Sequence, residues 1–252
     1  MLKRIDVAVL PSEALAMTAS AYVVVDALRA TTTIATLFHR GLNDLVVLDD
    51  MAAARARAAE DRRLLFGEVG GIRPEGFDYG NSPTEAQSAE VEGRGAVLFT
   101  TNGTRALCAL GEHGAVYAGA PANATALADA LHRHEHAVLV CAGTDDARRF
   151  ALEDFAAVGM MLHVIQRTAD GVSLGDAAGL ALRAAARPPG ATRGRPLPSP
   201  GELLMVSSEH ARKLKALGFE RDVAFCAEVD TSKAVPMVVS CGPGWALLRD
   251  SR

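Results

Sequence analysis

The fold of this 252-residue chain is decided first by residues 22–33, YVVVDALRATTT. A short apolar run ends at Asp26, and a threonine-rich segment then leads into a helical pattern over residues 32–40, which Gly41 closes. An apolar run of this length ahead of a helix predicts a buried strand that feeds the helix. This strand-to-helix unit is the repeating element of α/β proteins.

The same unit recurs on both sides of this stretch. Apolar runs predict strands at residues 5–9, 22–26, 45–48, 64–67, 96–100, 116–119, 137–141, 223–226 and 235–239. Helices are predicted at residues 32–40, 51–62, around Leu107, and at 125–132, 152–167 and 202–217; another starts at the capping box Ser82 to Glu85. The alternation predicts a three-layer α/β/α fold with a mainly parallel or mixed sheet.

The domain organisation is predicted to be a single unit over residues 1–252, with two similar lobes, 1–135 and 136–252, as the alternative. Residues 187–201, rich in proline, glycine and arginine, predict a linker. A plain surface connection is the favoured interpretation, and a flap that carries cations to the site is the other.

The net charge of −4 gives no positive field for a polyanion, so nucleic acid is not an expected partner. No apolar run approaches the roughly 20 residues that span a bilayer, so no membrane partner is expected. The four cysteines form no C-x-x-C pair and are too sparse for a disulfide scaffold. We therefore expect a cytoplasmic protein; assembly into a homo-oligomer stays open.

Reactive and anion-binding side chains follow the carboxyl ends of four predicted strands. The four segments are 26–33, Gly67 with Glu68, 100–105, and 141–143 leading to Glu153 and Asp154. In parallel α/β sheets the ligand lies beyond the carboxyl ends of the strands. We therefore expect the four segments to converge on one crevice.

The residue types at these ends predict a metal and a phosphate together. Carboxylates provide the hard oxygen ligands that suit Mg²⁺, and arginines offer planar forks for phosphate, sulfonate or carboxylate. Gly103 lets the backbone approach an anion closely. The acids are Asp26, Glu68, Glu153 and Asp154; the arginines are Arg29 and Arg105; the hydroxyl donors include Thr31, Thr32, Thr101 and Thr104.

Each element also has a purely structural interpretation. Asp26 could cap the next helix, and Asn102-Gly103 is by itself more often a tight turn than a site. Glu153 and Asp154 are adjacent, hence about 100° apart on a helix, so only one easily faces the crevice squarely. Structural reasons would have to coincide at four separate strand ends, and that coincidence favours function.

Four motifs together resemble the 2-phosphosulfolactate phosphatase (ComB) family. They are DALRATTT at 26–33, GE at 67–68 with EGFDYGNSP at 75–83, TTNGTR at 100–105, and CAG at 141–143 with LED at 152–154. They follow the family's order between residues 22 and 160, and residues 222–239 resemble its C-terminal strands. One departure is Val69, where many relatives are expected to carry arginine; it leaves the exact substrate open.

The resemblance implies a three-layer fold and a Mg²⁺-dependent phosphatase that converts 2-phospho-3-sulfolactate to 3-sulfolactate and phosphate, a step of coenzyme M biosynthesis. From the charges of the residues themselves we predict catalytic roles for Asp26, Arg29, Arg105, Glu153 and Asp154, and metal binding by Asp26, Glu68 and Asp154. The predicted substrate-binding residues are Thr31, Thr32, Asn81, Thr101, Asn102, Gly103 and Thr104.

Two questions stay open from the sequence. The attacking group is either a metal-bound water or the Asp26 carboxylate, and the missing D-x-D pattern favours water. The substrate is either 2-phosphosulfolactate or another phosphorylated 2-hydroxy acid. A non-catalytic binder of an anionic metabolite is the rival from another class; clustered acids argue against it, because they would repel the ligand unless a cation lay between them.

Overall fold

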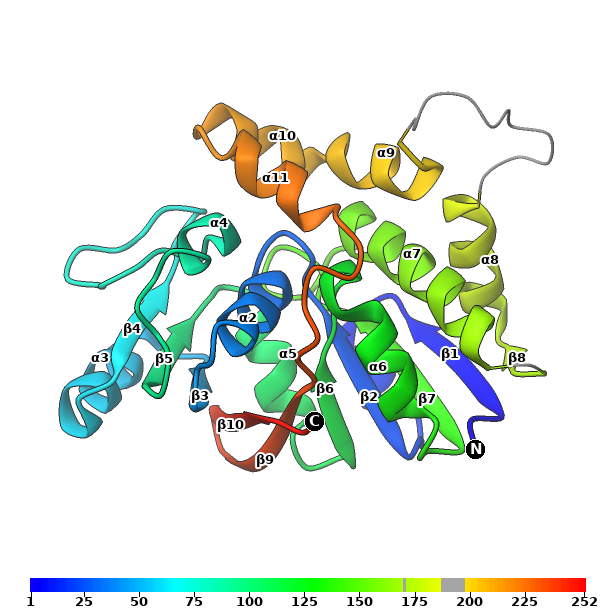
Figure 1. Cartoon of the computed structure of the whole chain (residues 1–252), viewed down its shortest axis with the longest axis horizontal. Helices are drawn as coiled ribbons and strands as arrows, with labels where there is room; N and C mark the ends of the chain where they lie inside the picture. Colours follow the sequence, from blue (N-terminus) through cyan, green and yellow to red (C-terminus); the bar gives the residue numbers. More distant parts are fainter. Residues whose placement is uncertain (170, 187–197) are drawn as a thin grey trace.

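The computed structural model describes residues 1–169, 171–186 and 198–252. Within them ten strands form one mixed sheet in the order β4-β5-β3-β10-β9-β6-β2-β7-β1-β8 (Figure 1). The strands are β1 (Arg4–Ala8), β2 (Ala21–Val25), β3 (Asp44–Leu48), β4 (Leu64–Gly67), β5 (Gly95–Phe99), β6 (Ala115–Ala118), β7 (His136–Cys141), β8 (Ser173–Leu174), β9 (Pro236–Gly242) and β10 (Trp245–Asp250).

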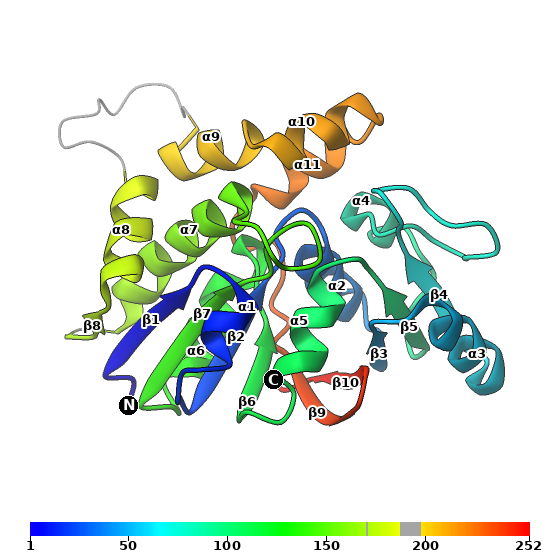
Figure 2. The same cartoon turned by 180° about the vertical axis from the view of Figure 1, so that it is seen from behind.

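Helices cover both faces of this sheet, as Figures 1 and 2 show from opposite sides. They are α1 (Pro11–Ala14), α2 (Ala30–His39), α3 (Met51–Asp61), α4 (Pro83–Ala86), α5 (Gly103–Leu110), α6 (Ala124–Leu131), α7 (Leu152–Thr168), α8 (Asp176–Ala185), α9 (Pro200–Val206), α10 (Glu209–Ala216) and α11 (Glu220–Cys226), with a 3₁₀ turn at Pro121–Asn123. The predicted α/β class is confirmed. None of these helices is long and apolar enough to cross a bilayer.

The apolar run of strand β2 is unbroken because both faces of the strand are buried. Val23 and Val25 pack in one core cluster with residues of α6 and α7, whereas Tyr22 and Val24 pack in another with residues of α2 and α5. Successive side chains of a strand point to opposite faces. A strand with helices on both faces therefore buries every residue, and all five residues of β2 are buried.

The sheet contains two sets of parallel strands, and the carboxyl ends of β2 and β7 lie at the same edge. Strand β2 is parallel to β6 and β7, and β7 is parallel to β1. Strands β3, β4 and β5 form a second parallel set. The hairpin of β9 and β10 joins the two sets by antiparallel pairing with β6 and β3. Because β7 pairs with strands from before residue 135, one sheet spans that position; the two-lobe alternative stays a prediction.

Two predicted elements near the C-terminus are wrong. Residues 223–226 are not a strand but the end of helix α11, since a four-residue apolar run is too short to show which period it follows. The predicted helix 202–217 is two helices, α9 and α10, because the Ser208 hydroxyl accepts the Ala211 N–H and starts a new helix. Strand β10 was not predicted. Most of the linker predicted at 187–201 lies outside the described residues, and Pro200 and Gly201 begin α9.

Helices α9, α10 and α11 form a cap, defined here as residues 200–226, at the top of both views (Figures 1 and 2). The cap packs on α7 through α9 and on α4 through α11. A buried ion pair of 2.8 Å between Arg29 and Asp222 fastens α11 to the loop that follows β2. The cap therefore lies over the carboxyl end of β2, which Asp26 directly follows.

Candidate active site

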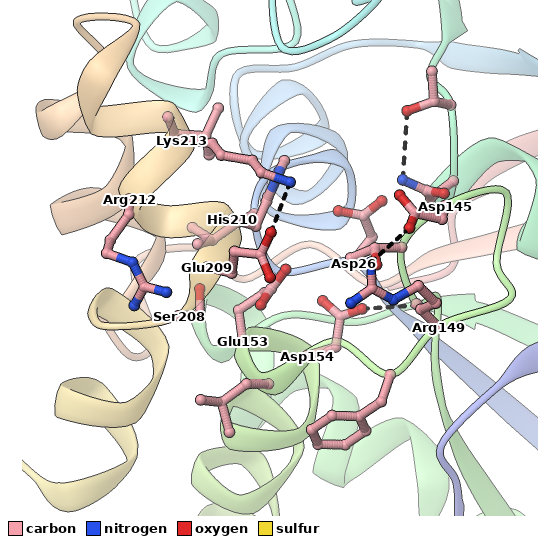
Figure 3. Close-up of a pocket in the computed structure, with 18 of the residues that line it drawn as sticks. Asp26, Asp145, Arg149, Glu153, Asp154, Ser208, Glu209, His210, Arg212 and Lys213 are labelled. Carbon is pink, nitrogen blue, oxygen red and sulfur yellow. Dashed lines mark hydrogen bonds and ion pairs between the residues drawn. The ribbon is translucent and has the colours of Figure 1, made fainter.

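A cavity of about 720 Å³ lies between the carboxyl edge of the sheet and the cap. Figure 3 shows the acids Asp26, Glu153 and Asp154 together, with residues of α10 on one side and Arg149 on the other. Residues from all these elements line the cavity, among them Asp26, Leu28, Thr101, Asn102, Gly143, Asp145, Arg149, Glu153, Asp154, Ser208, Glu209, His210, Arg212 and Lys213. The volume suits a small organic ligand.

Asp26 is held in place by its own chain. Its carboxylate accepts the Ala30 N–H at 3.2 Å, and the Thr31 hydroxyl donates to its carbonyl at 2.9 Å. Gly103 of α5 packs directly against it, since a Cβ at that position would lie 2.6 Å from Asp26 Oδ2. Real Cβ contacts are not that short, so the position of Asp26 requires glycine there.

Glu153 and Asp154 form the first turn of α7, and both are buried while lining the cavity. The Asp154 carboxylate accepts the N–H of Ala27 at 3.0 Å and the N–H of Gly143 at 3.1 Å. These two donors come from the ends of β2 and β7, which are neighbours in the sheet. The sheet therefore fixes Asp154 beside Asp26, as the strand-end argument predicts.

Asp26, Glu153 and Asp154 form what we call the acidic floor of the cavity. Two of these carboxylates, Asp26 and Asp154, have raised pKa values. Burial, with smaller contributions from the charges of Glu68 and Glu153, raises the pKa of Asp26 to about 6, against the Ala30 hydrogen bond and the charge of His210. Burial, together with the charges of Asp26 and Glu153, raises the pKa of Asp154 well above its usual range. Negative charge gathered in a buried place favours binding of a cation.

Glu68 does not line the cavity, but it binds a residue that does. Its two carboxylate oxygens accept the Gly71 N–H at 2.7 Å and both the N–H and the hydroxyl of Thr101 at 3.0 Å. Thr101 itself lines the cavity together with Asn102. Glu68 therefore orients Thr101 through direct hydrogen bonds and places a negative charge near Asp26.

The donor chemistry of the floor fits Mg²⁺. Among the described residues, no three His, Cys, Asp or Glu side chains converge as a complete ligand set. Mg²⁺ is normally held by only one or two carboxylates, together with waters and substrate phosphate oxygens. Asp26 and Asp154 meet that requirement, with Glu153 beside them.

The two predicted arginines do not line this cavity. Arg29 is buried, donates to Asp222 at 2.8 Å and to the Gly71 carbonyl at 2.6 Å, and lies over the Phe219 ring. Arg105 is partly exposed and pairs at 2.8 Å with Asp146, which does line the cavity. The structure thus places Arg105 beside the mouth and Arg29 behind the wall, and their catalytic roles stay predictions.

The predicted substrate-binding residues fall into two groups. Thr31, Thr32 and Thr104 are fully buried, and each hydroxyl donates to a backbone carbonyl of its own loop. Asn81 lies in a second cavity of about 520 Å³ with Arg29, and its buried amide oxygen has no partner among the described residues. Only Thr101 and Asn102 line the acidic cavity, with Gly103 directly behind Asp26.

Cys141 lies close to the acids of the cavity, and Val69 stands where many relatives are expected to carry arginine. Burial raises the pKa of the Cys141 thiol well above its usual value, with the Asp154 charge adding to the effect, so this cysteine is not a ready nucleophile. Val69, which stands where an arginine is expected, is half exposed and does not line the cavity.

Comparison with known proteins identifies the family. A family model described as 2-phosphosulpholactate phosphatase matches residues 9–240. This chain belongs to that family. Proteins named probable 2-phosphosulfolactate phosphatase are 36% identical over 218 residues in Thermotoga petrophila, covering 86% of this chain and 88% of the relative. In Thermus thermophilus the identity is 38% over 239 residues, covering 93% and 94%. In Deinococcus radiodurans it is 37% over 225 residues, covering 86% of each chain.

Membership of the 2-phosphosulpholactate phosphatase family makes this chain a phosphoric monoester hydrolase. The acids that the sequence predicts at four strand ends therefore belong to a phosphatase, and the structure gathers Asp26, Glu153 and Asp154 in one cavity. The roles of individual residues within the phosphatase site stay predictions.

Several residues that line the cavity of this phosphatase were not predicted from the sequence. Asp145 and Arg149 follow the carboxyl end of β7, the place where ligand-binding residues of parallel sheets are expected, so they were predictable. Ser208, His210 and Lys213 lie on the cap, distant in sequence from every strand end. Their segment has the pattern of an ordinary amphipathic surface helix, which gives no signal of a site.

Proposed function

We propose that this phosphatase hydrolyses 2-phospho-3-sulfolactate to 3-sulfolactate and phosphate with the help of Mg²⁺, the type of step that coenzyme M biosynthesis requires. The observation that carries the proposal is the group of buried carboxylates, Asp26, Glu153 and Asp154, at the floor of a cavity with cationic walls. A doubly negative phosphoryl group can approach such a floor only when a cation lies between them. The choice of 2-phosphosulfolactate as the substrate rests on the names of the relatives.

Asp26 and Asp154 would hold the ion, and the N–H groups of Ala27 and Gly143 fix the position of the Asp154 carboxylate. When bound there, Mg²⁺ would neutralise phosphoryl oxygens as charge develops during transfer. Glu153 lines the same cavity and can accept a proton from an attacking water. A phospho-enzyme at Asp26 is the alternative, and chemical trapping of an acyl phosphate distinguishes the two.

Apolar side chains of the cap and of the strand-end loops help to keep water out of the cavity. Leu214 and Leu217 of the cap line it, and so do Leu28 and Leu152. Excluding water strengthens electrostatic interactions within the site. We also propose that the enzyme acts in the cytoplasm, since all four of its cysteines are free thiols.

The test is phosphate release from a panel of esters, measured with Mg²⁺ and with EDTA. The panel holds 2-phosphosulfolactate, 2-phospholactate and phosphoglycolate. We expect the highest kcat/KM for 2-phosphosulfolactate, its loss in EDTA and its return when Mg²⁺ is restored. Equal rates in EDTA would refute the metal. A higher kcat/KM for another ester would identify that compound as the better substrate, and binding without any turnover would favour the non-catalytic alternative.

A further inference from the structure

Two cationic side chains reach the cavity from opposite walls. Arg149 belongs to the loop after β7, where the backbone N–H and carbonyl of Thr144 bond to Arg149 at 2.9 and 3.1 Å. Lys213 belongs to α10 of the cap. Figure 3 shows the two on either side of Asp26, Glu153 and Asp154. Residues more than sixty positions apart in sequence thus bring two positive charges to one cavity.

Glu209 is the shared neighbour of these two cations. Lys213 Nζ lies 3.0 Å from the Glu209 carboxylate, as the dashed line in Figure 3 shows. The hydrogen bond and charge of Lys213, and then the charge of Arg149, hold the pKa of Glu209 below its usual value. The charge of Glu209 in turn adds to the raised pKa of Arg149, whose main cause is Asp145. Glu209 therefore pairs with Lys213 and lies near enough to Arg149 for their charges to interact.

These ion pairs are open to exchange. The side chains of the Arg149–Asp145 pair are 66% and 60% exposed, and those of the Lys213–Glu209 pair are 64% and 61% exposed. Exposed pairs of this kind contribute little to stability, because water competes for both charges. Both cations can therefore turn to an acid group of a ligand without loss of the fold.

The two arginines that the sequence predicts for anion binding do not line the cavity. Arg29 is buried against Asp222, and Arg105 lies outside the cavity, although its partner Asp146 lines it. Of the cationic side chains that do line it, Arg212 donates to the carbonyl of Ser207 in the same cap. Arg149 and Lys213 are left as the pair that faces the acidic floor from two sides.

We infer that Arg149 and Lys213 together bind the second acid group of the substrate, a sulfonate or carboxylate, while its phosphoryl group lies on the floor at Asp26 and Asp154. Glu209 pairs with Lys213 and competes with that group for its charge. This inference deepens the proposed function and rests on it. The two residues determine specificity: they select phosphate esters that carry a second acid group over esters whose only charged group is the phosphate.

The test compares Arg149→Gln, Lys213→Gln and Glu209→Gln with Arg183→Gln, which removes an exposed arginine of α8 outside the cavity. Each variant is assayed with 2-phosphosulfolactate and with p-nitrophenyl phosphate, which lacks the second acid group. We expect Arg149→Gln and Lys213→Gln to raise KM for 2-phosphosulfolactate about tenfold, equivalent to about 1.4 kcal/mol of binding free energy. Their KM for p-nitrophenyl phosphate should rise far less, because this ester has no second acid group to bind. Glu209→Gln should lower KM for 2-phosphosulfolactate, and Arg183→Gln should change nothing.

A binding measurement separates this inference from the proposed function. Calorimetric titration with 3-sulfolactate, which carries the acid groups but no phosphate, is run on the wild type and the same variants. Weaker binding by Arg149→Gln and Lys213→Gln supports the inference even if 2-phosphosulfolactate is not hydrolysed. Binding equal to wild type in both variants, no binding by wild type, or an equal loss with both esters would overturn it.

Discussion

The guanidinium of Arg29 lies 2.8 Å from the carboxylate of Asp222, and both side chains are almost completely buried. Asp222 also accepts the Ser82 hydroxyl at 2.7 Å, and Arg29 also donates to the Gly71 carbonyl. The pair therefore ties the cap to the loop after β2 and to the start of α4. Since cap residues between Ser207 and Leu217 line the cavity, this pair helps to hold the cap over the acidic floor.

Asp222→Asn should destabilise the protein strongly. Removing one partner of a buried ion pair leaves an uncompensated charge and typically costs about 3–5 kcal/mol. We expect a clear fall in the urea midpoint of unfolding. The matched control is Glu135→Gln, which breaks the exposed pair of Lys3 and Glu135 and should leave the midpoint unchanged. Equal midpoints in wild type and Asp222→Asn would show that the pair does not fasten the cap.

Gly103→Ala should impair catalysis through Asp26. The new Cβ would lie 2.6 Å from Asp26 Oδ2 and 2.7 Å from the Ala30 Cβ, so the carboxylate must shift. Displacements of about 1 Å in a catalytic group can cost roughly 100-fold in rate. The measurement is kcat with 2-phosphosulfolactate, and Gly179→Ala in α8, outside the cavity, serves as control. Wild-type kcat in Gly103→Ala would contradict the role given to this contact.

Asp26→Asn should stabilise the metal-free protein above pH 6. The pKa of Asp26 is raised from its ordinary 3.8 to about 6, mainly by burial. The folded state therefore binds more protons between these two values, so Asp26 becomes destabilising as pH rises through them. A shift of this size corresponds to about 3 kcal/mol.

Urea unfolding of wild type and Asp26→Asn in EDTA, from pH 4 to pH 8, measures this effect. The advantage of the variant should be smallest near pH 4 and should level off above pH 6. A difference between the two proteins that does not vary with pH would show that Asp26 titrates normally.

The sequence was a good guide to the sheet because its strands are buried on both faces and therefore read as unbroken apolar runs, as Tyr22 to Val25 do. It was a poor guide to the cap. Val223 and Cys226 lie in a run too short to distinguish helix from strand, and the break at Ser208 depends on a single hydroxyl cap.

In the candidate site, too, the residues at the strand ends were predictable from the sequence and those of the cap were not. Asp26, Glu153 and Asp154 were predictable, because parallel strands bring their carboxyl ends to one edge. His210 and Lys213 were not, because only the docking of the cap brings α10 over that edge. The burial of Arg29 also depends on the cap, since its partner Asp222 lies 193 positions further along the chain.

The role of the buried carboxylates is tested most sharply by the Mg²⁺-dependent hydrolysis of 2-phosphosulfolactate by Asp154→Asn, compared with wild type at equal folded concentration. Asn keeps the size of the side chain and can still accept one N–H through its amide oxygen, but it removes the negative charge. We predict a fall in kcat of roughly 100-fold or more, the scale seen when one charge-stabilising group is removed from a site, with a higher Mg²⁺ concentration needed for half-activation. Full activity with an unchanged Mg²⁺ requirement would contradict the claim that these carboxylates hold the ion that the phosphoryl group meets.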